Sequence, residues 1–320
     1  MKIENRIPVP HLSRWIRGVI VFLILVILWG AYVRSTGSGA GCGSHWPLCN
    51  GQIIPMEPSL KTMVEFFHRI TSGISLALVL WTGLRIFRAF PKGKFIRKMA
   101  TIAMISILME AIIGAGLVLF ELVSHDQSIK RVISIALHFI NTLILLGALS
   151  LAYASTFRRG NKFSWQLQGL KKPAYLFTAF FFVLGMAGAV TALGDTLFPS
   201  QSLLQGIHQD WNPESHFLIK LRVIHPILAI LFILFTIPWI LSKRASCTSN
   251  QAKKLGVQTT ALLSANFILG ILNLLWLAPI LLQILHLLVA LCIWISWILL
   301  LDSLTADRAF VARSQEISKK

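Results

Sequence analysis

The chain has 320 residues, of which 55% are hydrophobic and 13% are charged, and its formal net charge is +18. A soluble domain of this length would carry about twice that share of charged residues, so the composition excludes an ordinary soluble enzyme and indicates an integral membrane protein. The positive charge does not indicate a nucleic-acid partner, because most basic residues gather in a few short segments between apolar runs.

Eight apolar runs follow one another along the chain, each close to the roughly 20 residues that a helix needs to cross the hydrocarbon core. They predict an all-α fold with spans near 16–33, 70–84, 99–120, 132–153, 174–193, 217–241, 255–278 and 280–301. The first run is long and no small-residue cleavage site follows it, so we expect a retained helix and not a signal peptide.

The basic residues are distributed unevenly between the two sides of this topology. Twenty-three of the 30 Lys and Arg residues lie in the N-terminal tail up to Arg17, in segments 85–98, 158–172 and 243–254, and in the C-terminal tail. All five segments fall on one side of an eight-span protein. Because cytoplasmic loops carry the excess of Lys and Arg, both termini are predicted to be cytoplasmic. The lack of an Arg- and Ser-rich transit peptide favours a bacterial plasma membrane over an organelle.

The first four and the last four spans share landmarks at a nearly constant offset, which is typical of an internal repeat. The offsets are 158, 157, 156 and 148 residues, for Gly30 with Gly188, His68 with His225, Glu110 with Asn266, and His138 with His286. The repeat predicts two pseudo-symmetric four-helix bundles, residues 1–157 and 173–320, joined by a cytoplasmic linker at 158–172.

Four of the nine histidines lie in predicted spans, on the second and fourth span of each half: His68, His138, His225 and His286. A hydrogen bond between helices could explain one such histidine. Four at matching depth indicate a binding function, because ionisable groups in a bilayer are costly. Zinc would require further Cys or carboxylate ligands, whereas a haem takes one axial ligand on each face. The sequence has no Cys-x-x-Cys-His motif for covalent haem attachment, so we expect one bis-histidine haem in each half.

The two halves differ in the residue three positions before the first histidine, which shares its helix face. This residue is Glu65 in the first half and Arg222 in the second. Glu65 could stabilise a developing cation or act as a general base, and Arg222 could pair with a haem propionate. Each could also be an interfacial charge that meets water. Glu110 and Asn266 are predicted to make polar contacts between helices or to serve a haem.

A second difference is a pair of cysteines, Cys42 and Cys49, in the loop after the first span. On the predicted topology this loop faces an oxidising compartment, where disulfides persist. The pair could be a structural staple of the loop or a redox-active disulfide that exchanges electrons with a nearby haem. The corresponding loop of the second half, 194–199, has no cysteine.

Three motifs resemble the haem A synthase family: Ser-Thr-Gly-Ser-Gly-Ala-Gly-Cys at 35–42, Trp-Pro-Leu-Cys at 46–49, and Glu-Phe-Phe-His-Arg at 65–69. The resemblance extends over nearly the whole chain. It implies that a ring methyl of haem O is oxidised to the formyl of haem A for terminal oxidase assembly. It also implies a set of roles: His68 and His138 as ligands of the substrate haem O, His225 and His286 as ligands of a cofactor haem b, Glu65 as the essential carboxylate, and Cys42 with Cys49 as the disulfide.

Candidate partners on this interpretation are haem O, the haem O synthase, an electron carrier such as the quinone pool, the lipid bilayer and a second copy of the chain. Two other classes of protein remain open. A diheme b-type cytochrome for electron transfer would explain the four histidines but not Glu65 or the cysteine loop. A haem carrier would not require the closed histidine pair of the second half, and a purely structural subunit would not need matched histidines.

Overall fold

The structure is a computed structural model that describes residues 9–157 and 172–318, and within these residues it contains helices and no strand. Four long helices form a first bundle: α1 (Val9–Ser35), α2 (Leu60–Ala89), α3 (Phe95–Leu119) and α4 (Ile129–Ser155). Four more form a second bundle beside it: α5 (Lys172–Leu197), α8 (Ile224–Ser246), α9 (Asn250–Leu275) and α10 (Ile280–Ser318). Apart from Lys172, the predicted linker 158–172 lies outside the described residues.

Two short helices, α6 (Leu203–Trp211) and α7 (Phe217–Leu221), connect α5 to α8. Among the described residues, eight segments are long and apolar enough to cross a membrane, with α7 and α8 together forming one of them. This confirms the predicted all-α fold with eight spans.

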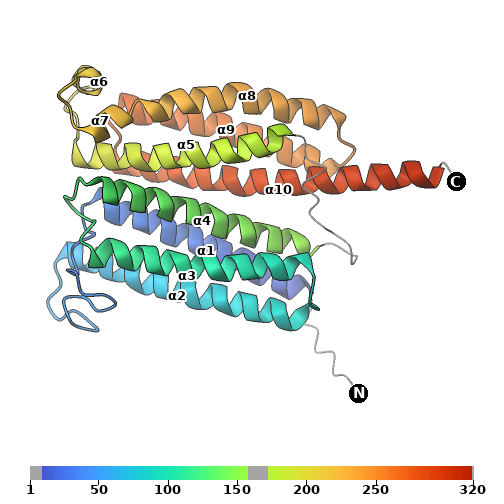
Figure 1. The fold of residues 1–320 in the computed structure, drawn as a ribbon, viewed down its shortest axis with the longest axis horizontal. Helices are drawn as coiled ribbons and strands as arrows, with labels where there is room; N and C mark the ends of the chain where they lie inside the picture. The colour runs from blue at the N-terminus through green and yellow to red at the C-terminus, as the bar shows by residue number, and fades with distance from the viewer. Residues whose placement is uncertain (1–8, 158–171, 319–320) are drawn as a thin grey trace.

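Both bundles run in the same sense (Figure 1). The start of α1, the end of α10, and the turns after α2 and α8 lie at one end of the molecule, which we call the terminal end. Residues 36–59, α6, and the turns after α3 and α9 lie at the other end, which we call the loop end. The basic segments 85–98 and 243–254 therefore both lie at the terminal end, in agreement with the predicted pattern of charge.

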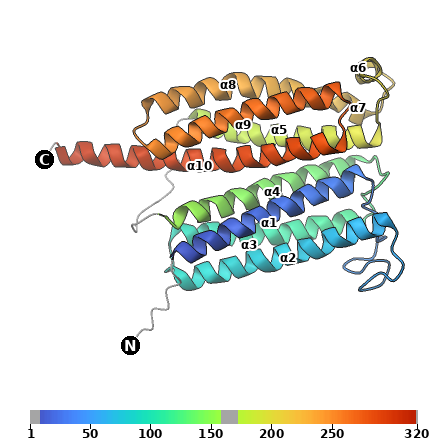
Figure 2. The ribbon, with the colours of Figure 1, turned by 180° about the vertical axis from the view of Figure 1, so that it is seen from behind.

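The four helices of the first bundle form a closed square, whereas in the second bundle α5 and α10 are bridged by α4 of the first. In the first bundle α2 packs on α1 and α3, and α4 packs on α3 and α1, so α2 and α4 lie diagonally opposite. In the second bundle α8 and α10 are likewise separated by α9. The bundles meet where α1 and α4 pack against α5 and α10 (Figure 2). Across this interface Trp294 donates a 2.7 Å hydrogen bond from Nε1 to the carbonyl of Leu143.

The helix boundaries differ from the predicted spans for physical reasons. The span predicted at 70–84 is part of a helix that begins at Leu60, because Ser59 caps it by accepting a hydrogen bond from the amide of Thr62. The span predicted at 217–241 is broken between α7 and α8, just before Pro226. Proline lacks the N–H that would bond to the carbonyl of Arg222, and its ring crowds that carbonyl.

Basic side chains hold down the connections at the loop end. Arg131 donates to the carbonyls of Ser124 (2.8 Å) and Asp126 (2.6 Å). Lys220 donates to the carbonyl of Pro213 at 2.5 Å. Bonds from a charged donor are stronger than neutral ones, so these residues stabilise the loop backbone that would otherwise lack partners.

Candidate functional site

The four predicted histidines lie in comparable places. His68 is on α2, His138 on α4, His225 on α8 and His286 on α10, and all four side chains are half-buried. His68, His138 and His286 lie roughly two helical turns from the loop end of their helices, and His225 lies as far from the start of α7. In each bundle the two histidines therefore come from the diagonally opposite helices.

The two rings in the second bundle lie close together in an edge-to-face orientation. The ring centroids of His225 and His286 are 6.2 Å apart. A metal ion bound at about 2 Å to one nitrogen of each ring would place the centroids roughly 6 Å apart, so this spacing fits one metal between the two rings. Nδ1 of His225 lies 3.2 Å from the carbonyl of Leu184, which leaves its Nε2 for a ligand. Across the described residues no cluster of three or more His, Cys, Asp or Glu could hold a metal, so a closed zinc site is absent there.

Two glycines of the internal repeat form seats for the histidines on α2 and α8. A Cβ atom added to Gly30 of α1 would lie 2.9 Å from Cε1 of His68. A Cβ added to Gly188 of α5 would lie 2.9 Å from Cε1 of His225. Only a residue without a side chain allows these rings to approach the neighbouring helix so closely. The equivalence predicted between Gly30 and Gly188 thus corresponds to equivalent contacts.

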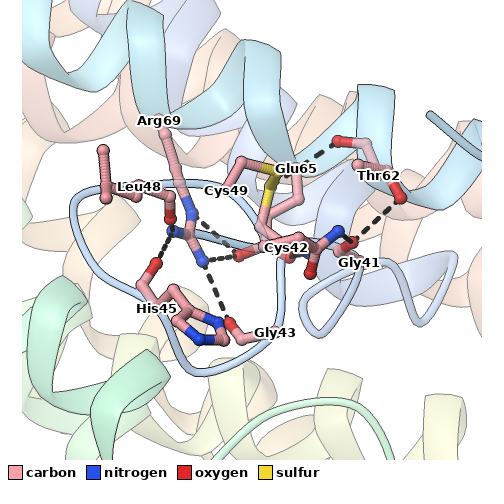
Figure 3. A network of polar contacts seen from close by, with 10 residues as sticks. Gly41, Cys42, Gly43, His45, Leu48, Cys49, Thr62, Glu65 and Arg69 are labelled. Carbon is pink, nitrogen blue, oxygen red and sulfur yellow. Dashed lines mark hydrogen bonds and ion pairs between the residues drawn. A yellow bond between two sulfur atoms is a disulfide. The ribbon is translucent and has the colours of Figure 1, made fainter. Parts of the chain in front are cut away.

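Glu65 lies at the centre of a network that joins α2 to the cysteine loop (Figure 3). Its side chain is buried, and Oε2 accepts a 2.8 Å hydrogen bond from the backbone amide of Cys42. Oε1 accepts from Nε and NH2 of Arg69, one turn further along α2, at 3.0 and 2.5 Å. The predicted alternative of an interfacial charge that meets water is therefore wrong for Glu65.

Arg69 extends the network into the loop. Its guanidinium donates to the backbone carbonyls of His45 and Leu48, each at 2.6 Å, and to that of Gly43 at 3.3 Å. Cys42 and Cys49 form a disulfide with their Cα atoms 4.3 Å apart, and both cysteines are buried. Glu65 and Arg69 thus hold the disulfide loop against the helix that carries His68.

In the second bundle, a hydrogen-bond network of different composition surrounds Arg222, the residue at the position equivalent to Glu65. Arg222 is buried and donates to Asp210 on α6 at 2.8 Å, to Asp195 on α5 at 3.3 Å and to the carbonyl of Phe198 at 3.2 Å. Most of its donors are therefore occupied within the protein. This arrangement does not support the predicted alternative of a propionate partner, and it gives Arg222 the role of fixing the loop after α5.

The remaining polar residues join helices. Glu110 of α3 contacts His138 and Thr142 of α4, which confirms the predicted polar contact between helices. Arg34 of α1 reaches the second bundle, where it donates to the carbonyl of Ala192 at 2.5 Å and to Gln283 at 3.0 Å. The roles of Arg34 and Arg69 were not predicted from the sequence, because the acceptors of Arg69 in the loop are backbone carbonyls that any residue provides, and those of Arg34 in the second bundle lie about 160 to 250 residues away along the chain.

These features define the class of the molecule: a polytopic membrane protein with two histidine pairs, one of them beside a carboxylate and a disulfide loop. Residues 13–298 match the family COX15-CtaA, described as a cytochrome oxidase assembly protein. The chain belongs to this family, in which relatives are named haem A synthase.

Individual relatives agree with this assignment. The chain is 31% identical over 237 residues to a protein of Staphylococcus aureus (strain JH9) named heme A synthase, covering 70% of this chain and 72% of the relative. It is 33% identical over 179 residues to a heme A synthase of Exiguobacterium, covering 54% and 56%. It is 40% identical over 299 residues to a Thermus thermophilus protein named protoheme IX farnesyltransferase, covering 92% of this chain. The chain spans 48% of that relative, about half of its length.

Proposed function

We propose that this protein is a haem A synthase, which oxidises a ring methyl of haem O to the formyl group of haem A for terminal oxidase assembly. The observation that supports the proposal is that both bundles carry two histidines on diagonally opposite helices, whereas only the first bundle has a buried carboxylate bonded to a disulfide loop. Membership of the COX15-CtaA family and the names of the relatives support the same activity.

The two bundles take different roles in this proposal. Residues 1–157 form the catalytic half, in which His68 and His138 bind the iron of haem O. Residues 173–320 form the cofactor half, in which His225 and His286 bind the iron of haem b, as their 6.2 Å centroid spacing supports. Haem iron, when bound, supplies one-electron redox chemistry. The protein supplies the axial ligands, the orientation of the ring and the charges around it.

Glu65 is the catalytic carboxylate of the proposal. It lies three residues before His68 on the same helix, and its charge is buried at the edge of the proposed substrate site. A fixed negative charge there stabilises positive charge that develops on the substrate. The hydrogen bonds from Cys42 and Arg69 hold the carboxylate in one orientation, and they also hold the loop that covers this end of the bundle.

Location and partners follow from the same features. We place the protein in a bacterial plasma membrane with both termini cytoplasmic, since the described basic segments 85–98 and 243–254 lie at the same end as the start of α1 and the end of α10. The Thermus relative is about twice as long and is named protoheme IX farnesyltransferase. This supports a haem O synthase as a partner that delivers the substrate. The electron carrier, such as the quinone pool, and a second copy of the chain remain candidate partners.

The proposal is tested by extracting pigments from membranes that make haem O, with and without this chain, and separating them by chromatography. Haem A is expected only when the chain is present. Unchanged haem O beside a folded, haem-loaded protein, in a host that supplies the electron carrier, would favour the diheme electron-transfer cytochrome.

The glycine seats give a separate prediction about haem binding. Gly30→Ala is expected to displace the ring of His68 and to lower the haem affinity of the first half by roughly tenfold. Gly188→Ala is expected to displace the ring of His225 and to lower the haem affinity of the second half by a similar factor. Alanine stabilises a helix relative to glycine by about 0.5–1 kcal/mol, so helix instability would not explain the loss. Haem per chain, measured by pyridine haemochrome spectra, checks the result. Gly73→Ala, where a Cβ meets open space, is the control, and equal haem loss there would contradict the prediction.

A further inference from the structure

Glu110 forms a polar group with His138 and Thr142 that the proposed function does not use. Oε2 of Glu110 lies 2.5 Å from Nδ1 of His138, and its Oε1 lies 2.7 Å from the hydroxyl of Thr142. The same hydroxyl lies 3.0 Å from the carbonyl of His138, one turn earlier on α4. The ring N–H does not point straight at the carboxylate, so the pair is a close polar contact.

The second bundle lacks this group. Asn266 occupies the position of Glu110, and Ala290 occupies that of Thr142 at the offset that relates His138 to His286. Oδ1 of Asn266 is buried without a hydrogen-bond partner among the described residues, and the group of Asn266 that acts on His286 is its neutral backbone. A carboxylate therefore supports a histidine of the first pair but neither histidine of the second.

Within the first bundle, only one of the two histidines has a carboxylate at its Nδ1. Nδ1 of His68 is buried and has no hydrogen-bond partner in the part of the chain that the structure describes. Its ring is positioned by packing against Gly30. His138, by contrast, has a carboxylate at the nitrogen that faces away from a ligand bound through Nε2.

We propose that Glu110 is a positioning residue that makes His138 the more strongly donating ligand of the first haem and lowers the reduction potential of that haem. The inference rests on the proposed function, because it takes His138 as an axial ligand. A carboxylate at the outer nitrogen fixes the ring and increases its basicity, which stabilises ferric iron. A lower potential makes removal of an electron from the first haem easier, which is the direction that oxidation of a bound substrate requires.

The test is a redox titration of the purified, haem-loaded full-length chain, followed by the absorption of each haem. Glu110→Gln is expected to shift the ferric–ferrous equilibrium of the first haem toward the ferrous form by about tenfold, which for one electron is about 59 mV. The potential of the second haem should not change. Thr142→Val should produce a smaller shift in the same direction, because it loosens the carboxylate without removing it.

Two further variants complete the experiment. Asn266→Asp places a carboxylate beside His286 and should lower the potential of the second haem. Asn141→Ala is the matched control, because its side chain donates to the carbonyl of Ser106 and joins the same two helices without touching His138. An unchanged potential of the first haem in Glu110→Gln, with haem retained, would overturn the inference. If that variant does not fold, the absence of a shift in both Thr142→Val and Asn266→Asp would overturn it.

Failure of the proposed function gives a different result. A protein that holds no haem in its first half, or that keeps both haems with unaltered spectra after His138→Ala, would reject His138 as a ligand. The proposed function would then fail before the role of Glu110 is reached. Haem lost from the first half in His138→Ala, together with the potential shift in Glu110→Gln, would support both.

Discussion

Replacement of His225 or His286 by alanine is expected to reduce the haem content from two per chain to one and to abolish haem A formation. Each ring supplies one of two axial bonds, and their centroids are already 6.2 Å apart, so the remaining histidine would hold the haem from one face only. Removing groups that merely support a metal ligand weakens binding by 10- to 100-fold, so loss of the ligand itself should exceed about 100-fold. Haem-to-protein ratios and product chromatography measure both effects.

His208→Ala is the control for this experiment. His208 is an exposed histidine on α6, at the loop end of the same bundle, so its replacement should leave both haems in place. The haem that remains in His225→Ala should show the spectrum of the first half. A full complement of two haems in both alanine variants would contradict the assignment of this pair.

Glu65→Gln is expected to lower the rate of haem A formation by at least about 100-fold while the protein keeps both haems. Glutamine has nearly the same shape and can still accept the hydrogen bond from the amide of Cys42, so the variant removes mainly the charge. Arg69, which is nearly buried, would lose its ionic partner, and a broken buried pair typically costs about 3–5 kcal/mol. Chromatographic rates and thermal unfolding should therefore be measured together.

Glu57→Gln is the control for the loss of a carboxylate, because Glu57 is an exposed carboxylate on the same loop. It should leave both activity and stability unchanged.

Arg69→Gln should release the loop carbonyls of His45 and Leu48 and make the Cys42–Cys49 disulfide more accessible to reductant, measured by thiol labelling. Full activity in Glu65→Gln would remove Glu65 from the mechanism.

The eight spans could be predicted because a helix that crosses a membrane needs about 20 apolar residues, a signal that each segment carries by itself. The apolar run at 70–84 marks only the middle of α2, because hydropathy detects only the apolar part of a helix, and Lys61 and Glu65 lie before that part. Helix α6 was missed because nine residues at the loop end, with Gln205 and Asp210 among them, form no apolar run. Pro226 is the visible signal for the break before α8.

The candidate site was predictable to the extent that it depends on residue types at repeated positions. His225 and His286 were expected to pair, and their ring centroids lie 6.2 Å apart. A polar contact from Glu110 to another helix was also expected. The bonds of Arg69 and Arg222 to loop carbonyls could not be predicted, because a carbonyl leaves no mark in the sequence and its position depends on the path of the loop.

The basic side chains at the loop end affect the route by which an apolar tetrapyrrole reaches the interior of each bundle. Arg69, Arg131 and Arg222 each hold loop backbone by charge-assisted hydrogen bonds, which would have to break before a tetrapyrrole could pass between the loops. Separation of two helices sideways disturbs mainly apolar contacts, which lipid tails can replace. For the proposed substrate, entry and exit within the plane of the bilayer are therefore less costly than passage through the loops.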